Sequence, residues 1–260
     1  MVLSFVNKSR LKKSVIALLS GAIAVAGFAP SVLFPVTVLS LAMLFHLWAH
    51  AGRREAAWLG FAYGWAFFSV GVGWIGIALH TFGGMALWLA ILATGLFAAF
   101  LAVFPAAAGF FQAGIHAPVW ARTTLVMPAL WVLLEWVRGM IFTGFPWLSV
   151  GYSQAGASPL AGFAPLLGVY GVSLIVAVSA GLLTLLWQVH WKKQGKAAWV
   201  ALVLLWGAGA LGRTVSWTDP VGEPLKVALL QGNISQEIKF RESHLLATLD
   251  TYQRLVLGSD

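Results

Sequence analysis

Few side chains in this sequence could take part in chemistry, because only 9% of its 260 residues are charged. Glu135 is the one acidic residue within a long apolar run, and Arg138 follows it at i+3, on the same face of a helix. An ionisable residue inside a membrane-spanning segment is by default a functional-site hypothesis. The alternative is a structural ion pair of Glu135 and Arg138 that fixes the helix end and the following loop.

Histidines supply the next candidates. His46 and His50 have the i, i+4 spacing that can bind a metal, but no third ligand is evident, so we expect interfacial histidines and no metal site. His80, in the sequence HTFGG, lies at the end of another apolar run, where it could face a lipid head group or substrate. As a general base His80 would need a partner that the sequence does not identify.

Nucleophilic catalysis has little support in these residues. The segment Gly151–Gly156, GYSQAG, superficially suggests the nucleophile elbow of a serine hydrolase. It has one residue too many for G-x-S-x-G, and no suitable Asp and His pair lies nearby, so we reject a serine hydrolase. The chain contains no cysteine, which excludes a disulfide, a cysteine metal site and a thiol nucleophile from it.

Long apolar runs must position these residues. The chain is 60% hydrophobic with a mean hydropathy of +0.87, whereas an ordinary soluble domain carries roughly 25% charged residues. In lipid, backbone hydrogen bonding allows helices or closed barrels, and continuous runs without alternation indicate helices. The sequence therefore predicts an all-α polytopic membrane bundle over residues 1–213, with about seven transmembrane helices at 14–29, 31–50, 57–79, 85–115, 124–140, 166–189 and 197–211.

Basic residues predict the orientation of these helices. The loops facing outward before the seventh helix hold at most Arg138, at a helix end. The positive-inside rule then places the N-terminus in the cytoplasm and everything after Arg213 outside it. The net charge of +8 follows this pattern and does not indicate nucleic-acid binding. Ten basic residues fall on the cytoplasmic side: Lys8, Arg10, Lys12, Lys13, Arg53, Arg54, Arg122, Lys192, Lys193 and Lys196.

Two residue patterns are typical of helices in a bilayer. Gly60 and Gly64 form a G-x-x-x-G motif, a weak indication of close helix packing. Tryptophans are enriched at membrane interfaces, and many of the 14 here fall near the predicted cytoplasmic helix ends. These are Trp48, Trp58, Trp120, Trp187, Trp191 and Trp199.

Residues 143–168, which we call the outer segment, depart from a regular span. The segment is fairly apolar, but three prolines and several glycines interrupt it, which disfavours a continuous helix. Irregular backbone at membrane depth needs cover from protein or water. We interpret the outer segment as a folded or re-entrant element on the outer face; a merely long connection is the alternative.

Residues 214–260 have a different character. Leu225–Leu230, LKVALL, predicts a buried strand, and Arg241–Val256 predicts an amphipathic helix. One strand and one helix cannot bury their own apolar surface as an independent domain. We therefore expect residues 214–260 to be an incomplete N-terminal part of an α/β domain outside the cytoplasm, in a chain truncated at Asp260.

Several blocks of this sequence, in order along the chain, carry a family resemblance. The chain resembles bacterial apolipoprotein N-acyltransferase, and the block from Glu135 to Gln154 is the most specific match. The resemblance implies an eight-helix membrane domain with a nitrilase-like domain inserted before the last helix. The blocks are GFAP (Gly27–Pro30), GWIGIALHTFGGM (Gly73–Met85), EWVRGMIFTGFPWLSVGYSQ (Glu135–Gln154), APLLGVYGVS (Ala164–Ser173) and VALLQGNISQEIKF (Val227–Phe240).

The resemblance implies a two-step acyl transfer. In the family, a fatty acyl chain passes from a phospholipid to the α-amino group of a diacylglyceryl-cysteine, through a thioester on an activated cysteine. A glutamate acts as general base, and a lysine stabilises the oxyanion. None of these three maps to this chain: they are expected beyond Asp260, and Lys226 and Lys239 are not matches. The chain itself is therefore predicted to be inactive.

The resemblance also implies binding residues and partners. Trp147, Tyr152 and Gln154 in the outer segment are predicted to contact lipid, together with His80 and with Phe240, where the family often has tryptophan. The expected partners are membrane phospholipid as donor and diacylglyceryl apolipoprotein as acceptor. We expect a monomer in the bacterial inner membrane, with no cofactor and no nucleic acid. A transporter or lipid-flipping protein and an inactive scaffold homologue are the alternatives, although few polar groups lie at the bilayer midplane.

Overall fold

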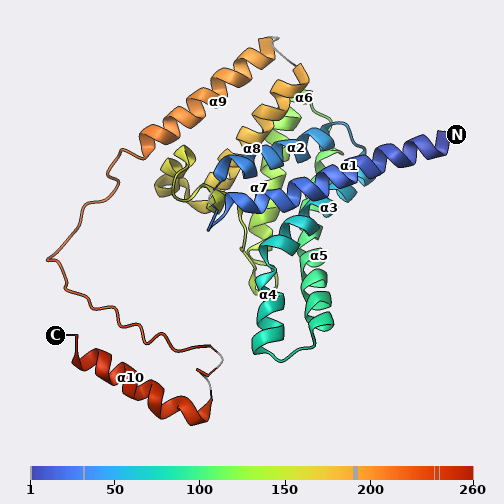
Figure 1. The fold of residues 1–260 in the computed structure, drawn as a ribbon. Helices are drawn as coiled ribbons and strands as arrows, with labels where there is room; N and C mark the ends of the chain where they lie inside the picture. The colour runs from blue at the N-terminus through green and yellow to red at the C-terminus, as the bar shows by residue number, and fades with distance from the viewer. Residues whose placement is uncertain (1, 32, 190–192, 237, 240, 260) are drawn as a thin grey trace.

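The structure, a computed structural model, describes residues 2–31, 33–189, 193–236, 238–239 and 241–259. These residues form helices and no strand. Figure 1 shows a bundle of helices from which a hairpin of α4 and α5 projects, and a C-terminal part that lies apart from the bundle. The longer helices are α1 (Val2–Ala24), α2 (Phe34–Ala49), α3 (Arg53–Gly71), α5 (Leu87–Gln112), α7 (Met127–Arg138), α8 (Ala164–Val189), α9 (Lys193–Gly212) and α10 (Leu245–Leu257).

Short helical turns connect these helices. The helices α4 (Trp74–Ile77) and α6 (Val119–Ala121) are each a single turn. Each of these two short helices continues into a π-helix, η2 (Ala78–Phe82) after α4 and η3 (Arg122–Val126) after α6. The remaining turns are 3₁₀ helices: η1 (Val25–Gly27), η4 (Ile141–Thr143), η5 (Val150–Gln154), η6 (Pro159–Phe163) and η7 (Glu242–His244).

Three helical stretches in the described residues are long and apolar enough to cross a membrane. They are α5, the stretch Pro159–Val189 formed by η6 and α8, and α9. The pair of α3 with α4–η2, bent by 47°, counts as a fourth if it is one span, whereas α2 is apolar but has 16 residues. The predicted helical bundle with candidate membrane spans is thus confirmed among the described residues before Arg213, and the total of about seven spans stays a prediction.

Close backbone contact joins α3 to α5. A Cβ atom on Gly60 would lie 2.8 Å from the carbonyl carbon of Pro105, and one on Gly64 would lie 3.1 Å from Cα of Ala102. Side chains larger than hydrogen would therefore separate the two helices. The structure confirms that the G-x-x-x-G motif marks a helix-packing face.

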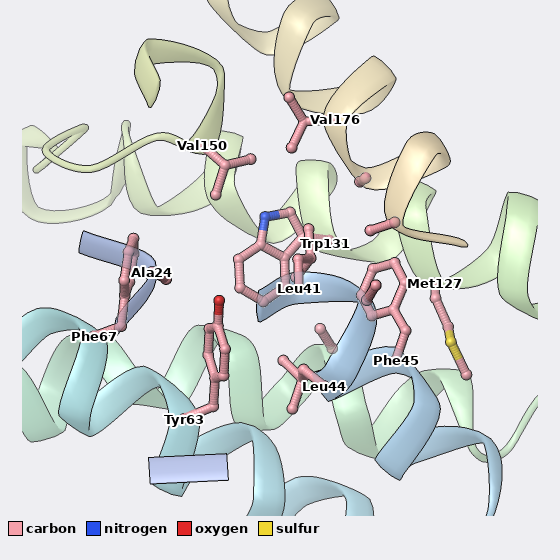
Figure 2. Close-up of a cluster of buried hydrophobic side chains, with 14 of the residues drawn as sticks. Ala24, Leu41, Leu44, Phe45, Tyr63, Phe67, Met127, Trp131, Val150 and Val176 are labelled. Carbon is pink, nitrogen blue, oxygen red and sulfur yellow. The ribbon is translucent and has the colours of Figure 1, made fainter. Parts of the chain in front are cut away.

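An aromatic core lies where α2, α3 and α7 meet (Figure 2). Trp131 of α7 packs with its ring centroid 6.0 Å from that of Tyr63 and 6.5 Å from that of Phe45. The Tyr63 hydroxyl lies 3.0 Å from Ser40 Oγ, which in turn donates to the carbonyl of Ser20 at 2.6 Å. A buried hydroxyl must find a hydrogen-bond partner, and Ser40 finds one in the carbonyl of Ser20. This hydrogen bond joins α1 to the core formed by the other three helices.

Contacts between helix ends fall into two sets at opposite ends of the bundle. At one end Lys13 and Glu55 form an ion pair of 2.9 Å, which joins α1 to α3. At the same end Arg122 donates from Nη2 to the carbonyl oxygens of Trp48 and Ala49, the last residues of α2. A cation at the C-terminus of a helix satisfies carbonyls that lack helical partners and opposes the negative end of the helix dipole.

The second set joins the other ends of the helices. Thr37, near the start of α2, donates to the carbonyl of Ala24 at the end of α1 at 2.9 Å. The backbone of Gly162 in η6 packs directly against that of Gly209 near the end of α9. In each contact of this second set, residues at or just before the start of one helix lie against the end of another.

The C-terminal residues make a separate, extended part (Figure 1). The predicted strand Leu225–Leu230 is irregular in the structure, and Leu225 and Leu229 are 88% and 93% exposed. A strand is stabilised by ladder hydrogen bonds to a neighbour, and the described residues offer it none. The predicted helix Arg241–Val256 corresponds to η7 and α10, whose apolar face is exposed. The β-α unit of a nitrilase-like domain stays a prediction.

Candidate functional site

The outer segment is an irregular folded element, as predicted. It leaves α7 through η4, continues through η5 and η6, and reaches the first turn of α8. Three consecutive residues, Phe142, Thr143 and Gly144, have positive φ angles of 52°, 72° and 84°. Such angles cost roughly 1–3 kcal/mol each for residues other than glycine. The surrounding contacts must therefore stabilise this backbone path.

Glu135 supplies one of these contacts. Its buried carboxylate accepts a hydrogen bond from the backbone N–H of Val150 at 3.0 Å through Oε2. Its Oε1 accepts a hydrogen bond from the Ser173 hydroxyl of α8 at 2.5 Å. The same hydroxyl accepts from the backbone N–H of Gly151 at 2.8 Å. Glu135 and Ser173 together therefore fix the start of η5 against α7 and α8.

Arg138 supplies the other contacts. Its Nη1 donates to the carbonyl oxygens of Phe145 at 2.6 Å and Trp147 at 2.7 Å, and its guanidinium lies 5.0 Å from the centroid of the Phe68 ring. The ion pairs within 4 Å in the described part of the chain do not include Glu135 with Arg138. Hydrogen bonds to the outer segment satisfy both buried charges, and Glu135 and Arg138 as a structural ion pair stay a prediction.

Aromatic side chains cover the outer segment beside α4 and α5. Trp147 is 51% exposed, and its ring centroid lies 5.5 Å from that of Trp74 and 6.1 Å from that of Phe145. Phe145 also makes an edge contact of 5.0 Å with Phe97 of α5. Exposed, clustered aromatic rings are the side chains that proteins place where lipid chains and head groups meet.

A groove of about 530 Å³ runs between α3, α4–η2 and α5. Its volume is within the range of about 300–1,000 Å³ that is typical of ligand pockets, and its walls are largely apolar. Polar groups are few: Ser69 Oγ is buried without a hydrogen-bond partner among the residues that the structure describes, and Thr94 Oγ1 donates to the Ala90 carbonyl at 2.8 Å. The remaining lining includes Trp65, Ala66, Val70, Gly73, Gly76, Ile77, His80, Thr81, Leu87, Ile91 and Gly95.

The predicted site residues have different positions in this arrangement. His80 lines the groove, and its Nδ1 lies 2.8 Å from the carbonyl oxygen of Met85. Tyr152 is 54% exposed on η5. Gln154 is 0% exposed, and its amide binds the hydroxyls of Ser153 and Ser158, each at 2.7 Å. In this arrangement the Gln154 amide stabilises the outer segment from within, and its predicted contact with lipid stays a prediction.

Two further points concern residues named from the sequence. Phe240 lies outside the described residues, so its predicted role stays a prediction. The rings of His46 and His50 have centroids 5.0 Å apart, and no group of three or more His, Cys, Asp or Glu that could hold a metal occurs in the described ranges. Sequence reasoning missed Ser173 as a site residue. The signal that could have identified it was its place in the family-like block Ala164–Ser173.

Comparison with known proteins decides the family. The family model of the apolipoprotein N-acyltransferase N-terminal domain matches residues 20–182, more than half of the chain. This chain belongs to the apolipoprotein N-acyltransferase family. Proteins named apolipoprotein N-acyltransferase are 46% identical over 243 residues in Nitrosomonas europaea, 40% over 245 residues in Methylococcus capsulatus and 42% over 243 residues in Coxiella burnetii.

The extent of these matches is informative for the family assignment. They cover 92%, 93% and 92% of this chain, but 48%, 48% and 50% of the respective relatives. The chain therefore spans about half the length of the curated relatives that it matches. The groove, the aromatic cluster and the outer segment all lie within residues 20–182, the part assigned to the N-terminal domain of this acyltransferase family.

Proposed function

We propose that residues 1–213 are a membrane domain that binds the lipid substrates of an N-acyltransferase. The complete reaction in this proposal transfers a fatty acyl chain from a phospholipid to the α-amino group of the diacylglyceryl-cysteine of an apolipoprotein. The observation that carries the proposal is the apolar groove between α3 and α5, next to an aromatic outer segment. Residues 214–260 are, in the same proposal, the start of a nitrilase-like domain outside the cytoplasm.

The chemical step in this proposal needs residues other than those of this chain. A thioester intermediate requires a thiolate nucleophile, and the 260 residues contain no cysteine. The glutamate, lysine and cysteine that the family resemblance implies do not map to residues 1–260. The side chains described above bind and orient lipid, and they do not form the covalent intermediate.

Lipid recognition in the groove must rest on shape and polar groups. A phospholipid chain is already surrounded by hydrocarbon in the bilayer, so moving it into an apolar groove gains little from the hydrophobic effect. Ser69 Oγ and His80 are polar groups in the groove wall, and Trp147 lies beside α4. We expect the acyl chain to follow α3 and α5, with its ester and head group near His80.

The proposed topology has seven spans, with a cytoplasmic N-terminus and residues after Arg213 on the periplasmic side of the inner membrane. The two sets of end contacts support it. The end of the bundle with Lys13, Glu55 and Arg122 is rich in basic residues, whereas Arg138 is buried by the outer segment at the opposite end. We propose a monomer, because α1 to α9 already contact one another within one chain.

A transporter or lipid-flipping protein is less consistent with the buried charges. Charged residues in a transport pathway line a cavity near the bilayer midplane. Glu135 and Arg138 border a cavity of about 20 Å³, and their hydrogen bonds go to the outer segment and Ser173, which supports a fixed platform. An inactive scaffold homologue differs from our proposal in activity alone, and the second experiment below separates the two.

A groove-filling pair of variants tests the lipid site. Gly95 lines the groove, and Gly207 lies on α9; a Cβ atom at either position would meet nothing within 4 Å. The chain in lipid nanodiscs would be labelled with a phospholipid that carries a photoreactive acyl chain. We expect label on peptides of α3 to α5 in wild type and Gly207→Leu, and a loss of most of it in Gly95→Leu. Equal labelling of the two variants would contradict the site.

A chimera tests the reaction. Residues 1–260 would be joined to the remaining half of the Nitrosomonas europaea relative, which is 46% identical over the shared part. Mass spectrometry of a diacylglyceryl lipopeptide incubated with the chimera and phospholipid should reveal a third acyl chain. A folded chimera that takes up the photoreactive lipid but never acylates the peptide would contradict the enzymatic function and favour a scaffold.

A further inference from the structure

The outer segment lies on the bend between α3 and α4. The helix α3 ends at Gly71, α4 begins at Trp74, and the two directions differ by 47°. Leu148 packs directly on Gly71, where a Cβ atom would lie 3.0 Å from Leu148 Cδ2 and closer still to Cδ1. Trp147 packs on Trp74 just after the bend. Two consecutive residues of the outer segment therefore contact α3 and α4 on either side of the bend.

The bend determines one wall of the groove. The groove is lined by Ser69 and Val70 before the bend, by Gly73 within it, and by Gly76 and Ile77 after it. A change in the angle between α3 and α4 would move the residues after the bend relative to α5. The width of the groove thus depends on contacts that lie outside it.

Ser173 connects the outer segment to the bundle. We infer that Ser173 is a positioning residue: by joining Glu135 to Gly151 it holds Trp147 and Leu148 against the α3–α4 bend and so sets the width of the groove. The hydroxyl donates to Glu135 and accepts from the N–H of Gly151, using both of its hydrogen-bonding capacities at once. That the groove holds lipid rests on the function proposed above.

Alanine at position 173 would remove both hydrogen bonds. Ser173 is fully buried and Gly151 is buried, so bulk water has no direct access to replace the hydroxyl. Hydrogen bonds to a charged group contribute roughly 1.5–3 kcal/mol. This free energy corresponds to roughly a 10- to 100-fold change in the equilibrium for local opening of the outer segment.

Ser179 is a matched control on the same helix. It is also fully buried in α8, and its hydroxyl accepts a hydrogen bond from Trp206 Nε1 of α9 at 3.1 Å. Ser179→Ala therefore makes the same chemical change and removes a partly buried hydrogen bond. Its partner is α9, which takes no part in the α3–α4 bend.

Hydrogen–deuterium exchange on the 260-residue chain in nanodiscs tests the inference. In Ser173→Ala we expect amides of residues 147–152 and of residues 72–80 to exchange roughly 10- to 100-fold faster than in wild type. Ser179→Ala should leave both regions unchanged. If residues 72–80 exchange as in wild type in Ser173→Ala, or equally fast in both variants, the inference is overturned.

A second variant and a lipid measurement complete the test. If Ser173→Ala does not fold, Leu148→Ala removes the contact with Gly71 and leaves the polar groups intact, and unchanged exchange at residues 72–80 would then overturn the inference. Labelling of α3 to α5 by the photoreactive phospholipid should fall in Ser173→Ala. If residues 72–80 exchange faster in this variant but the labelling is unchanged, the inference is also overturned. A wild type that takes no label overturns the proposed function, while exchange still decides the role of Ser173.

Discussion

Gly60→Ala should destabilise the bundle by separating α3 from α5. The new Cβ atom would lie 2.8 Å from the carbonyl carbon of Pro105, whereas ordinary contact begins at 3.4 Å. The carbonyl oxygen of Pro105 would lie closer still, so the helix backbones must move apart by more than this difference of about 0.6 Å, because the opposing atoms belong to the main chain of α5. Overpacking of this kind typically costs about 1–3 kcal/mol.

Equilibrium unfolding measures this cost. The chain in mixed micelles would be titrated with a denaturing detergent and followed by circular dichroism. We expect the free energy of unfolding to fall by about 1–3 kcal/mol in Gly60→Ala. Gly207→Ala is the control, because its Cβ atom meets nothing within 4 Å and alanine is the better helix former by up to about 1 kcal/mol.

The result also bears on the groove, since α3 and α5 form two of its walls. If the free energies of unfolding of Gly60→Ala and Gly207→Ala differ by less than about 0.5 kcal/mol, the close approach of α3 and α5 does not stabilise the packing of these two helices. The reasoning from small residues at the helix interface would then be refuted.

Three further predictions concern topology, lipid contact and chemistry. Reporter fusions after Lys193 and after Thr218 should report opposite sides of the membrane, and the same side for both would rule out seven spans. In the chimera described above, Trp147→Ala should lower acyl transfer severalfold at unchanged abundance, whereas Trp199→Ala on α9 should not; equal effects would remove Trp147 from the lipid site. The 260-residue chain, mixed with phospholipid and lipopeptide, should give no acyl-enzyme by mass spectrometry, and a covalent adduct would reveal a nucleophile other than cysteine.

Features that depend on local chemistry could be predicted from the sequence. Helices follow from continuous apolar runs, because in lipid each peptide group must find its partner within the same segment. The irregular path of the outer segment follows from its prolines and glycines, since they interrupt helical hydrogen bonding. The motif at Gly60 and Gly64 indicated close helix packing, which α3 and α5 confirm.

The partners of the buried polar groups could not be predicted in this way. The i+3 spacing suggested that Glu135 pairs with Arg138, but Glu135 binds Ser173, 38 residues away, and Arg138 binds carbonyls of the outer segment. Gln154 was expected to face lipid and is instead buried between serines. Spacing along a helix restricts neighbours on that helix and carries no information about a segment that folds back over it.

Tertiary structure also decided the candidate site. The groove combines residues from α3, from α4–η2 and from α5, and its shape depends on a 47° bend that Gly71 and Gly73 permit but whose angle they do not determine. The sequence by itself determined that this chain forms apolar helices with an irregular segment between α7 and α8. Only the tertiary structure places that segment on the bend beside the groove, where Glu135, Arg138 and Ser173 hold it by hydrogen bonds. The sequence order does not show these contacts, because hydrogen bonds between distant residues form where the folded backbone brings donor and acceptor within reach.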